Sequence, residues 1–304
     1  MSLPDRKYQT HKPQELRNLA PKARDAVDFA DGSWVFQTKH DGCHVIVLVG
    51  INIVRIYSRE GKECVSMPHI AEYFRLNSAP NMVYFGEVWN MNMEFKDISG
   101  MFRRQRPGTE LQFWPFDSVT LQEFRAGKSE RPYIQRLRAL KTIANTTEGV
   151  IPVITHDTVA ECQDVVDRMR AHGYKFELDG FMAKKIDGGW EAGVDRQGLQ
   201  IKLKDVVSLD LECVGVIEGA GKFAGMVGAL EVMHKGERVT VSGGKLTDAQ
   251  RQTYWACANA VCKPHPNGII GKIVEVNILG FTPDGKLREP RFQRVRWDKS
   301  EPSE

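Results

Sequence analysis

The sequence predicts an α+β protein, and three observations support this. Short strands dominate residues 33–119, amphipathic helices follow at residues 131–172, and a second series of short strands begins after residue 206. A chain of 304 residues exceeds the usual size of one hydrophobic core, so two domains are expected. We therefore predict a short basic extension at 1–32, an α+β domain at 33–206 and a smaller β-domain at 207–304.

In the extension, a helix could begin at Pro13, a residue tolerated in a first turn, and Pro21 would limit its length. The larger domain alternates apolar and polar residues between turn signals. Its predicted strands are 33–38, 45–49, 51–57, 82–89, 111–119, 180–186 and 199–204. Its predicted helices, which flank mainly antiparallel strands, are 68–76, 131–145 and 158–172.

The second domain is rich in glycine, and one helix is expected at 247–262, where Thr247 could cap the first turn. The tail from Ser300 to Glu304 is predicted to be disordered. The predicted strands are 211–217, 228–234, 237–242 and 272–279. Four or five strands in about 100 residues suit a small barrel such as an OB-fold.

Composition limits the class of protein. Hydrophobic residues make up 41% and charged residues 27%, as in ordinary globular proteins, and no apolar run is long enough to span a bilayer. The N-terminus lacks the apolar stretch of a secretory signal, so we expect no membrane segment and a cytoplasmic location. The six cysteines are scattered without a C-x-x-C pair, which argues against a zinc module and for reduced thiols.

The net charge of +3 is small, but the basic residues are unevenly distributed. They cluster in residues 1–24, in the segment Arg103-Arg104-Gln105-Arg106 and between residues 286 and 299. Such clusters fit a nucleic-acid backbone, and each one alone is equally compatible with solvated surface charge.

One stretch carries chemical information. Lys39 follows a predicted strand, and Asp41-Gly42 would form the turn of a hairpin to the next strand. Taken alone, K-x-D-G is a weak signal, since a surface lysine beside a turn is common. Further polar segments follow at strand ends: S-R-E-G at 58–61, G-E at 86–87, F-D at 116–117, D-G-F-M-A-K at 179–184, K-L-K at 202–204 and R-W-D-K at 296–299.

In this order and spacing, these motifs resemble the ATP-dependent DNA ligases, which belong to the covalent nucleotidyltransferase superfamily. The resemblance covers residues 33–299, and the segment 282–292 is similar to the small two-domain ligases of bacteriophages. It implies a nucleotidyltransferase (adenylation) domain followed by an OB-fold domain. It further implies ATP and Mg²⁺ as cofactors, nicked double-stranded DNA as the partner, a monomer, and the cytoplasm of a bacterial or phage-infected cell.

The resemblance also assigns site residues. Lys39 would take AMP from ATP and pass the AMP to the 5′-phosphate of a nick. The 3′-hydroxyl would then displace the AMP and seal the strand. The implied catalytic residues are Lys39, Lys202, Lys204 and Lys299. The implied nucleotide-binding residues are Gln37, Lys39, Arg59, Glu87, Phe116, Lys184, Lys202, Lys204 and Arg296. Glu87 and Asp179 would bind the metal, and Arg59, Arg103, Arg104 and Arg106 would bind DNA.

These residue types suit the reaction. A lysine attacks phosphorus as the free amine, so nearby cations or desolvation must lower its pKa, and Lys184, Lys202 and Lys204 could do so while binding phosphate. Hard carboxylate oxygens suit Mg²⁺. His40, Cys43 and His44 are interpreted as packing residues.

The sequence departs from the family pattern at three positions: Gln37 and Asp179 stand where glutamate is usual, and His44 where arginine is usual. A glutamine amide can still hydrogen-bond adenine. The alternatives are an RNA ligase or GTP-using capping enzyme, and a noncatalytic OB-type nucleic-acid-binding protein. The latter gives no reason for K-x-D-G together with the later lysines.

Overall fold

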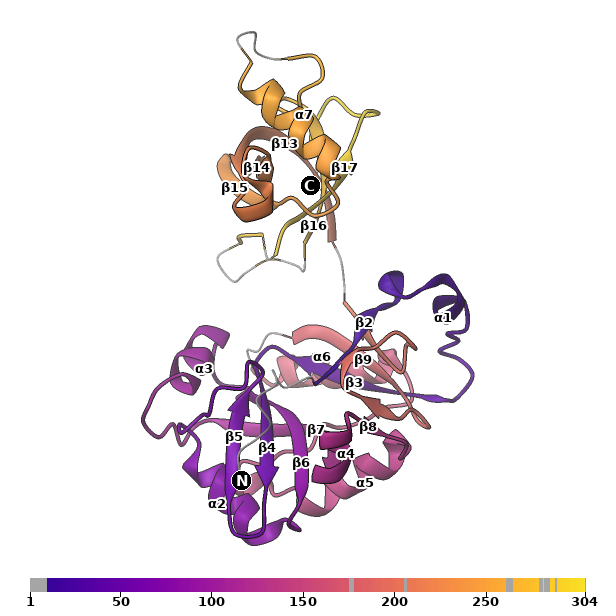
Figure 1. Ribbon diagram of the computed structural model, residues 1–304, viewed down its shortest axis with the longest axis vertical. Coiled ribbons are helices and arrows are strands. Elements are labelled where there is room, and N and C mark those ends of the chain that lie inside the picture. Colours follow the sequence, from indigo (N-terminus) through magenta and orange to yellow (C-terminus); the bar gives the residue numbers. More distant parts are fainter. Residues whose placement is uncertain are drawn as a thin grey trace. The chain divides into compact units, whose positions relative to one another are not determined.

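The chain divides into two units, Met1–Lys204 and Asp205–Glu304, in its computed structural model (Figure 1). The structure describes residues 10–174, 178–204, 207–260, 265–278, 281, 285–287 and 289–303. Mainly antiparallel sheets with flanking helices form the first unit and a barrel forms the second, so the α+β prediction is confirmed. Among the described residues, no helix has the length and apolar character needed to cross a membrane.

Two four-stranded sheets organise the first unit. One is antiparallel throughout, in the order β5 (Val54–Ser58), β4 (Cys43–Val49), β6 (Met82–Trp89) and β7 (Gln112–Thr120). The other has the order β2 (Gln14–Glu15), β12 (Gln200–Leu203), β9 (Leu178–Lys185) and β3 (Trp34–His40). In this second sheet β2 runs parallel to β12, and the other pairs are antiparallel.

The predicted hairpin around Asp41-Gly42 is wrong. β3 pairs with β9, from the far end of the unit, whereas β4 pairs with β5 and β6 in the other sheet. Asp41 and Gly42 are therefore the link by which the chain passes from one sheet to the other. The link is tight, because a Cβ added at Gly42 would lie 2.2 Å from the carbonyl oxygen of Val88.

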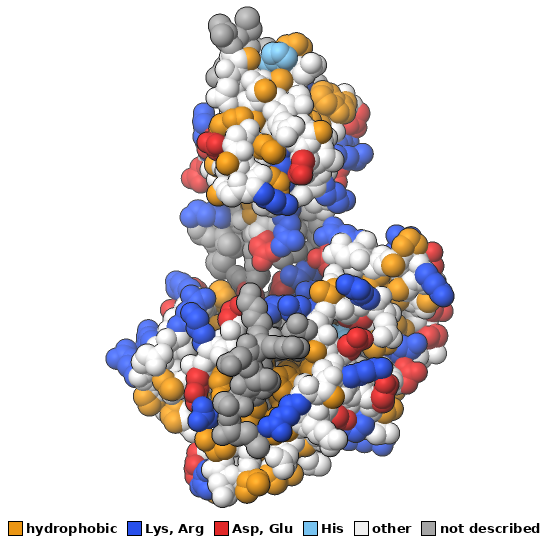
Figure 2. Space-filling view, in the orientation of Figure 1, with side chains coloured by type: hydrophobic (Ala, Val, Ile, Leu, Met, Phe, Trp, Pro, Cys, Tyr) orange, Lys and Arg blue, Asp and Glu red, His pale blue; other side chains and the backbone are white. Residues whose placement is uncertain are grey.

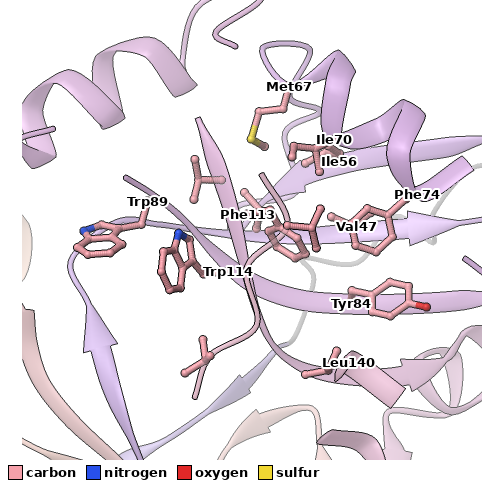
Figure 3. Close-up of a cluster of buried hydrophobic side chains, with 14 of the residues drawn as sticks. Val47, Ile56, Met67, Ile70, Phe74, Tyr84, Trp89, Phe113, Trp114 and Leu140 are labelled. Carbon is pink, nitrogen blue, oxygen red and sulfur yellow. The ribbon is translucent and has the colours of Figure 1, made fainter. Parts of the chain in front are cut away.

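Apolar side chains hold helices against both sheets. The largest core joins the β4–β7 sheet to α2 (Pro68–Asn77), α3 (Phe95–Phe102) and α5 (Tyr133–Ile143), as Figure 3 shows for part of it. A smaller core joins the β3–β9–β12 sheet to α6 (Val159–Ala171) through Phe36, Phe181, Ala183 and Ile201. The helices predicted at 68–76, 131–145 and 158–172 are thus present, while α3 and α4 (Leu121–Ala126) escaped sequence reasoning.

The residues predicted to form a separate basic extension instead take part in the first unit, as far as the structure describes them. β1 (His11–Lys12) pairs with β11 (Gly193–Val194), β2 pairs with β12, and Leu19 is buried. The helix predicted from Pro13 is wrong, because these residues pair with a sheet edge; η1 (Leu16–Asn18) and α1 (Pro21–Asp25) follow. Residues 1–9 of the predicted extension lie outside the described part.

The second unit is a closed barrel in which α7 (Asp248–Ala258) begins at a capping box of Thr247 and Gln250. The strands in barrel order are β13 (Val207–Glu218), β14 (Val227–His234), β15 (Glu237–Ser242), β17 (Arg291–Val295) and β16 (Ile273–Ile278). β17 was not predicted, yet it closes the barrel between β15 and β16. The tail is not disordered up to Ser303, whose backbone pairs with that of Asp210. The remaining short elements are β8 (Lys128–Ser129), β10 (Trp190–Glu191), η2 (Thr146–Glu148) and η3 (Gly221–Phe223).

Candidate active site

Lys39 lies near the end of β3, where the chain leaves one sheet of the first unit for the other. Its Nζ is 2.5 Å from Oδ2 of Asp179 on β9, and the other oxygen of the same carboxylate accepts a hydrogen bond from Lys204 Nζ at 2.7 Å. Burial alone would raise the pKa of Asp179, but Lys39 and Lys204 hold it below its usual value. One carboxylate thus bridges two lysines, Lys39 and Lys204, that are 165 residues apart in the sequence.

Lys202 and Arg59 add further positive charge to this cluster. Burial lowers the pKa of Lys202, and the charges of Lys39 and Lys204 lower it further. Arg59, exposed just after β5, acts on both Lys202 and Glu87. Four basic side chains, from β3, from β12 and the residue after it, and from the turn after β5, therefore lie in one cluster with Asp179 and Glu87. Such an arrangement suits a polyanion such as a triphosphate.

Glu87 brings a second carboxylate to the same place. It lies opposite His44 in the pairing of β6 with β4, and it is partly buried. The pKa of Glu87 is raised to about 8, mainly by burial and also by the negative charge of Asp179. The positive charges of Lys39 and Arg59 act in the opposite direction. A partly buried, mutually repelling pair of carboxylates is the kind of donor set that a divalent cation would neutralise.

These two carboxylates fit Mg²⁺, which proteins commonly bind through one or two carboxylates while phosphates and waters complete the shell. Among the described residues, no group of three or more histidine, cysteine, aspartate or glutamate side chains could hold a metal by itself. The donors needed beyond Glu87 and Asp179 would thus come from a bound nucleotide and water.

Beside this charged cluster lies an aromatic wall. Lys184 is buried; its Nζ donates to the backbone oxygen of Phe116 at 2.9 Å and lies 4.6 Å from the ring centroids of both Phe116 and Tyr133. Burial lowers the pKa of Lys184 to about 7. Gln37 donates from Nε2 to Tyr133 Oη at 2.8 Å. Lys184 therefore supports the aromatic side of the site, and a contact between its amine and phosphate stays a prediction.

Sequence reasoning missed Tyr133 and Arg136. Both belong to α5 and are fully buried, so helical periodicity marks them only as core positions. Arg136 donates to Asp117 from Nε at 2.7 Å and from Nη2 at 3.1 Å. Burial would raise the pKa of Asp117, but Arg136 holds it below its usual value. In the F-D motif, the aspartate thus anchors the strand that presents Phe116.

Two histidines follow Lys39 closely; His40 is buried and His44 is half-buried. The His40 ring stacks on Trp89 at 4.3 Å between centroids, and burial lowers the pKa of His40 to about 3. His44 lies 5.8 Å from the Phe116 ring, and burial, assisted by Arg59, likewise lowers its pKa to about 3. At neutral pH His44 is therefore uncharged, unlike the arginine usual at this position.

The predicted DNA-binding arginines Arg103, Arg104 and Arg106 are all exposed and directly follow α3. Lysine and arginine side chains are spread over the face drawn in Figure 2, between acidic and apolar ones. DNA contact by these arginines stays a prediction.

Arg296 and Lys299, predicted from R-x-D-K, belong to the second unit and are already paired there. Arg296 Nη1 donates to both oxygens of Asp210, at 2.9 and 2.7 Å, and Lys299 Nζ donates to Asp210 Oδ2 at 2.6 Å. Asp298 accepts two further hydrogen bonds from Arg296. For Arg296 and Lys299 to contact a nucleotide phosphate, as predicted, phosphate oxygens would have to replace Asp210 as their partner.

Comparison with known proteins identifies relatives of the whole chain. DNA ligase B of Mycobacterium tuberculosis is 27% identical over 298 aligned residues, which cover 91% of this chain and 57% of that protein. The multifunctional non-homologous end joining DNA repair protein LigD of the same species is 24% identical over 318 aligned residues, covering 95% of this chain and 40% of that protein. The chain thus spans about half the length of these curated relatives.

A solved structure from a study of Lig E DNA ligases as minimal DNA-binding scaffolds shares the fold, with a TM-score of 0.65 at 18% identity, covering 94% of this chain and 99% of that one. Residues 218–296 match the family model of the DNA ligase OB-like domain. Residues 16–204 match the family model of the ATP dependent DNA ligase domain. Because that match alone includes more than half of the sequence, this chain belongs to the ATP-dependent DNA ligase family.

Proposed function

We propose that this chain by itself seals nicks between a 5′-phosphate and a 3′-hydroxyl in duplex DNA, using ATP and an adenylate carried on Lys39. One observation supports this above all: Lys39 lies in a cluster with Asp179, Lys202, Lys204 and Glu87, contributed by strands β3, β9, β12 and β6. A structural lysine would need one carboxylate partner, whereas this cluster collects an excess of cations beside two carboxylates.

In the first step, the Lys39 amine attacks the α-phosphorus of ATP; a nitrogen–phosphorus bond forms, and the bond to the pyrophosphate oxygen breaks. The ion pair with Asp179 holds the Lys39 Nζ in place, and the amine must lose its proton before it attacks phosphorus. The same cations then stabilise the charge that develops on the phosphate oxygens.

The second and third steps transfer the adenylate and release it. An oxygen of the 5′-phosphate displaces Lys39 from phosphorus and forms a DNA-adenylate, and the 3′-hydroxyl then attacks that 5′-phosphate and expels AMP. Glu87 and Asp179 would hold Mg²⁺, which supplies electrostatic stabilisation of phosphate when bound. Gln37 and Phe116 would receive the base, and Arg59 phosphate.

The exposed arginines after α3 would contact the phosphates of the duplex, and the protein would work as a monomer. Sealing should therefore weaken as salt rises, since neutralising phosphates releases counterions. Sealing that is indifferent to salt would contradict this part of the proposal.

Incubation with α-labelled ATP and Mg²⁺ tests the nucleophile. The wild-type protein should retain label after denaturation, and Lys39→Ala should not. A matched control is Lys96→Ala, which removes an exposed lysine whose Nζ lies 2.9 Å from Glu94 Oε2 and should leave labelling unchanged. Labelling of Lys39→Ala at the wild-type level would overturn the assignment.

Comparison of nicked DNA, RNA and hybrid duplexes with ATP, GTP and NAD as cofactors tests the substrate. DNA sealing with ATP is expected. Sealing confined to RNA, or a preference for GTP, would favour the RNA ligase or capping-enzyme alternative.

A further inference from the structure

A chain of hydrogen bonds connects Gln37 to the aromatic wall of the active site. Gln37 Nε2 donates to Tyr133 Oη at 2.8 Å, and Tyr133 Oη donates to the backbone oxygen of Phe116 at 3.0 Å. Gln37 and Tyr133 are each 1% exposed, so water does not readily replace either partner. These contacts join β3, α5 and β7 beside Lys39.

The direction of each hydrogen bond follows from chemistry. A carbonyl oxygen can only accept, and a tyrosine hydroxyl has one proton to donate. Tyr133 gives that proton to Phe116, so its oxygen must accept from Gln37. The amide nitrogen of Gln37 therefore points at Tyr133, and its acceptor oxygen Oε1 points the other way.

Lys184 donates to the same carbonyl oxygen. Its Nζ also donates to the Phe116 oxygen, at 2.9 Å, so Tyr133 and Lys184 together use the two lone pairs of that carbonyl. Gln37 thus has no second place on Phe116 for its amide nitrogen. An ionised glutamate, which is usual at this position in the family, could not donate to Tyr133 at all.

We propose that Tyr133 is a positioning residue that orients the Gln37 amide and thereby selects adenine over guanine. The Oε1 acceptor suits the exocyclic amino group of adenine, whereas guanine presents an acceptor oxygen at that place and would be repelled. Phe116 anchors Tyr133 through its backbone oxygen, and its ring is also proposed to receive the base. One residue would therefore position both the ring and the polar edge of the base. This inference depends on the proposed reaction of Lys39 with a nucleoside triphosphate.

The variant Tyr133→Phe tests the proposal, because it keeps the ring beside Lys184 and removes the hydroxyl. The readout is kcat/KM for labelling of Lys39 with ATP and with GTP. The ratio of ATP to GTP should fall at least about tenfold, since a freed amide can turn its nitrogen toward the base. Tyr84→Phe is the matched control; Tyr84 is a buried tyrosine of the same unit whose hydroxyl lies 2.8 Å from Ser78 Oγ, and the ratio should not change.

Rescue separates positioning from packing. A carboxylate presents an acceptor whichever way it turns, so Gln37→Glu added to Tyr133→Phe should restore the preference for ATP. A fall in labelling by both nucleotides to the same extent, or no rescue by Gln37→Glu, would show that Tyr133 acts on the fold and would overturn the proposal. A wild-type protein that labels with neither nucleotide would instead refute the proposed function.

Discussion

Replacing Arg136 by methionine is the sharpest test of how the F-D motif is held in place. The substitution removes two hydrogen bonds to Asp117, at 2.7 and 3.1 Å. It also removes hydrogen bonds to three backbone oxygens, those of Arg131, of Gly188 at 3.0 Å and of Gly189 at 3.4 Å. The side chains of Arg136 and Asp117 are 0% and 2% exposed, so solvent cannot compensate the carboxylate that is left behind.

Breaking a buried ion pair by removing one partner costs about 3–5 kcal/mol, because an uncompensated charge stays in the interior. We expect Arg136→Met to lower the free energy of unfolding by this amount at neutral pH. The difference from the wild type should narrow as pH falls through about 4, where Asp117 of the unfolded chain becomes protonated. In the wild type the pKa of Asp117 is below its usual value. The pair therefore contributes its full stability at pH values above the usual pKa, and this contribution is lost as pH falls toward the lowered pKa.

Arg131→Met is the matched control, since Arg131 makes the same two-pronged contact with Glu123, at 2.8 and 2.7 Å, but is 34% exposed. Exposed pairs contribute about 0–1 kcal/mol. Urea denaturation, monitored through hydrogen exchange of the β7 amides, would measure the free energy of unfolding of the first unit in both variants. Equal destabilisation by the two substitutions would refute the view that burial makes the Arg136 pair costly to break.

Three further outcomes are expected. Gly42→Ala should slow labelling of Lys39 about 100-fold, because the new Cβ would lie 2.2 Å from the Val88 oxygen and displace the link beside the nucleophile. Gly100→Ala is the control and should not slow labelling, since a Cβ at Gly100 meets nothing within 4 Å. Equal labelling rates for the two variants would contradict this prediction. Burial lowers the pKa of His40 to about 3, so the free energy of unfolding of the wild type should fall by up to about 1.4 kcal/mol per pH unit as pH falls below 6.5. In urea titrations at acid pH, His40→Phe should lose correspondingly less of its free energy of unfolding. The same dependence on pH in both proteins would count against a buried neutral histidine. Changing Arg103, Arg104 and Arg106 together to alanine should flatten the salt dependence of binding to nicked DNA measured by fluorescence anisotropy, and a slope equal to that of the wild type would exclude these arginines from phosphate contact.

Local patterns predicted most elements because they report on the faces that each segment buries. The helix after Thr247 and the strands of the β4–β7 sheet have the periodicity and caps that sequence reasoning uses. β17 has the sequence R-F-Q-R-V, and its buried residues Phe292 and Val295 are three positions apart because a register shift interrupts its pairing with β16. The strand therefore lacks the strict alternation that predicts a strand from sequence.

Pairings between distant segments could not be predicted in this way. A turn signal at Asp41-Gly42 favours a hairpin, but it contains no information that β9 is a better partner for β3. The same limit applies to the site. Motif order singled out Lys39 and Asp179, whereas Tyr133 and Arg136 differ from ordinary core positions only through partners on other strands.

The pairing of β3 with β9 also has a consequence for synthesis of the chain. About 140 residues separate the two strands, so at usual translation rates β3 waits on the order of ten seconds before its partner exists. Throughout that time an apolar strand with unpaired edges is available for misassociation, and the contact order of its sheet is high. Nascent chains released before residue 178 should be unable to accept AMP. Lower growth temperatures or added chaperones should raise the yield of active protein more than they raise the total amount of protein.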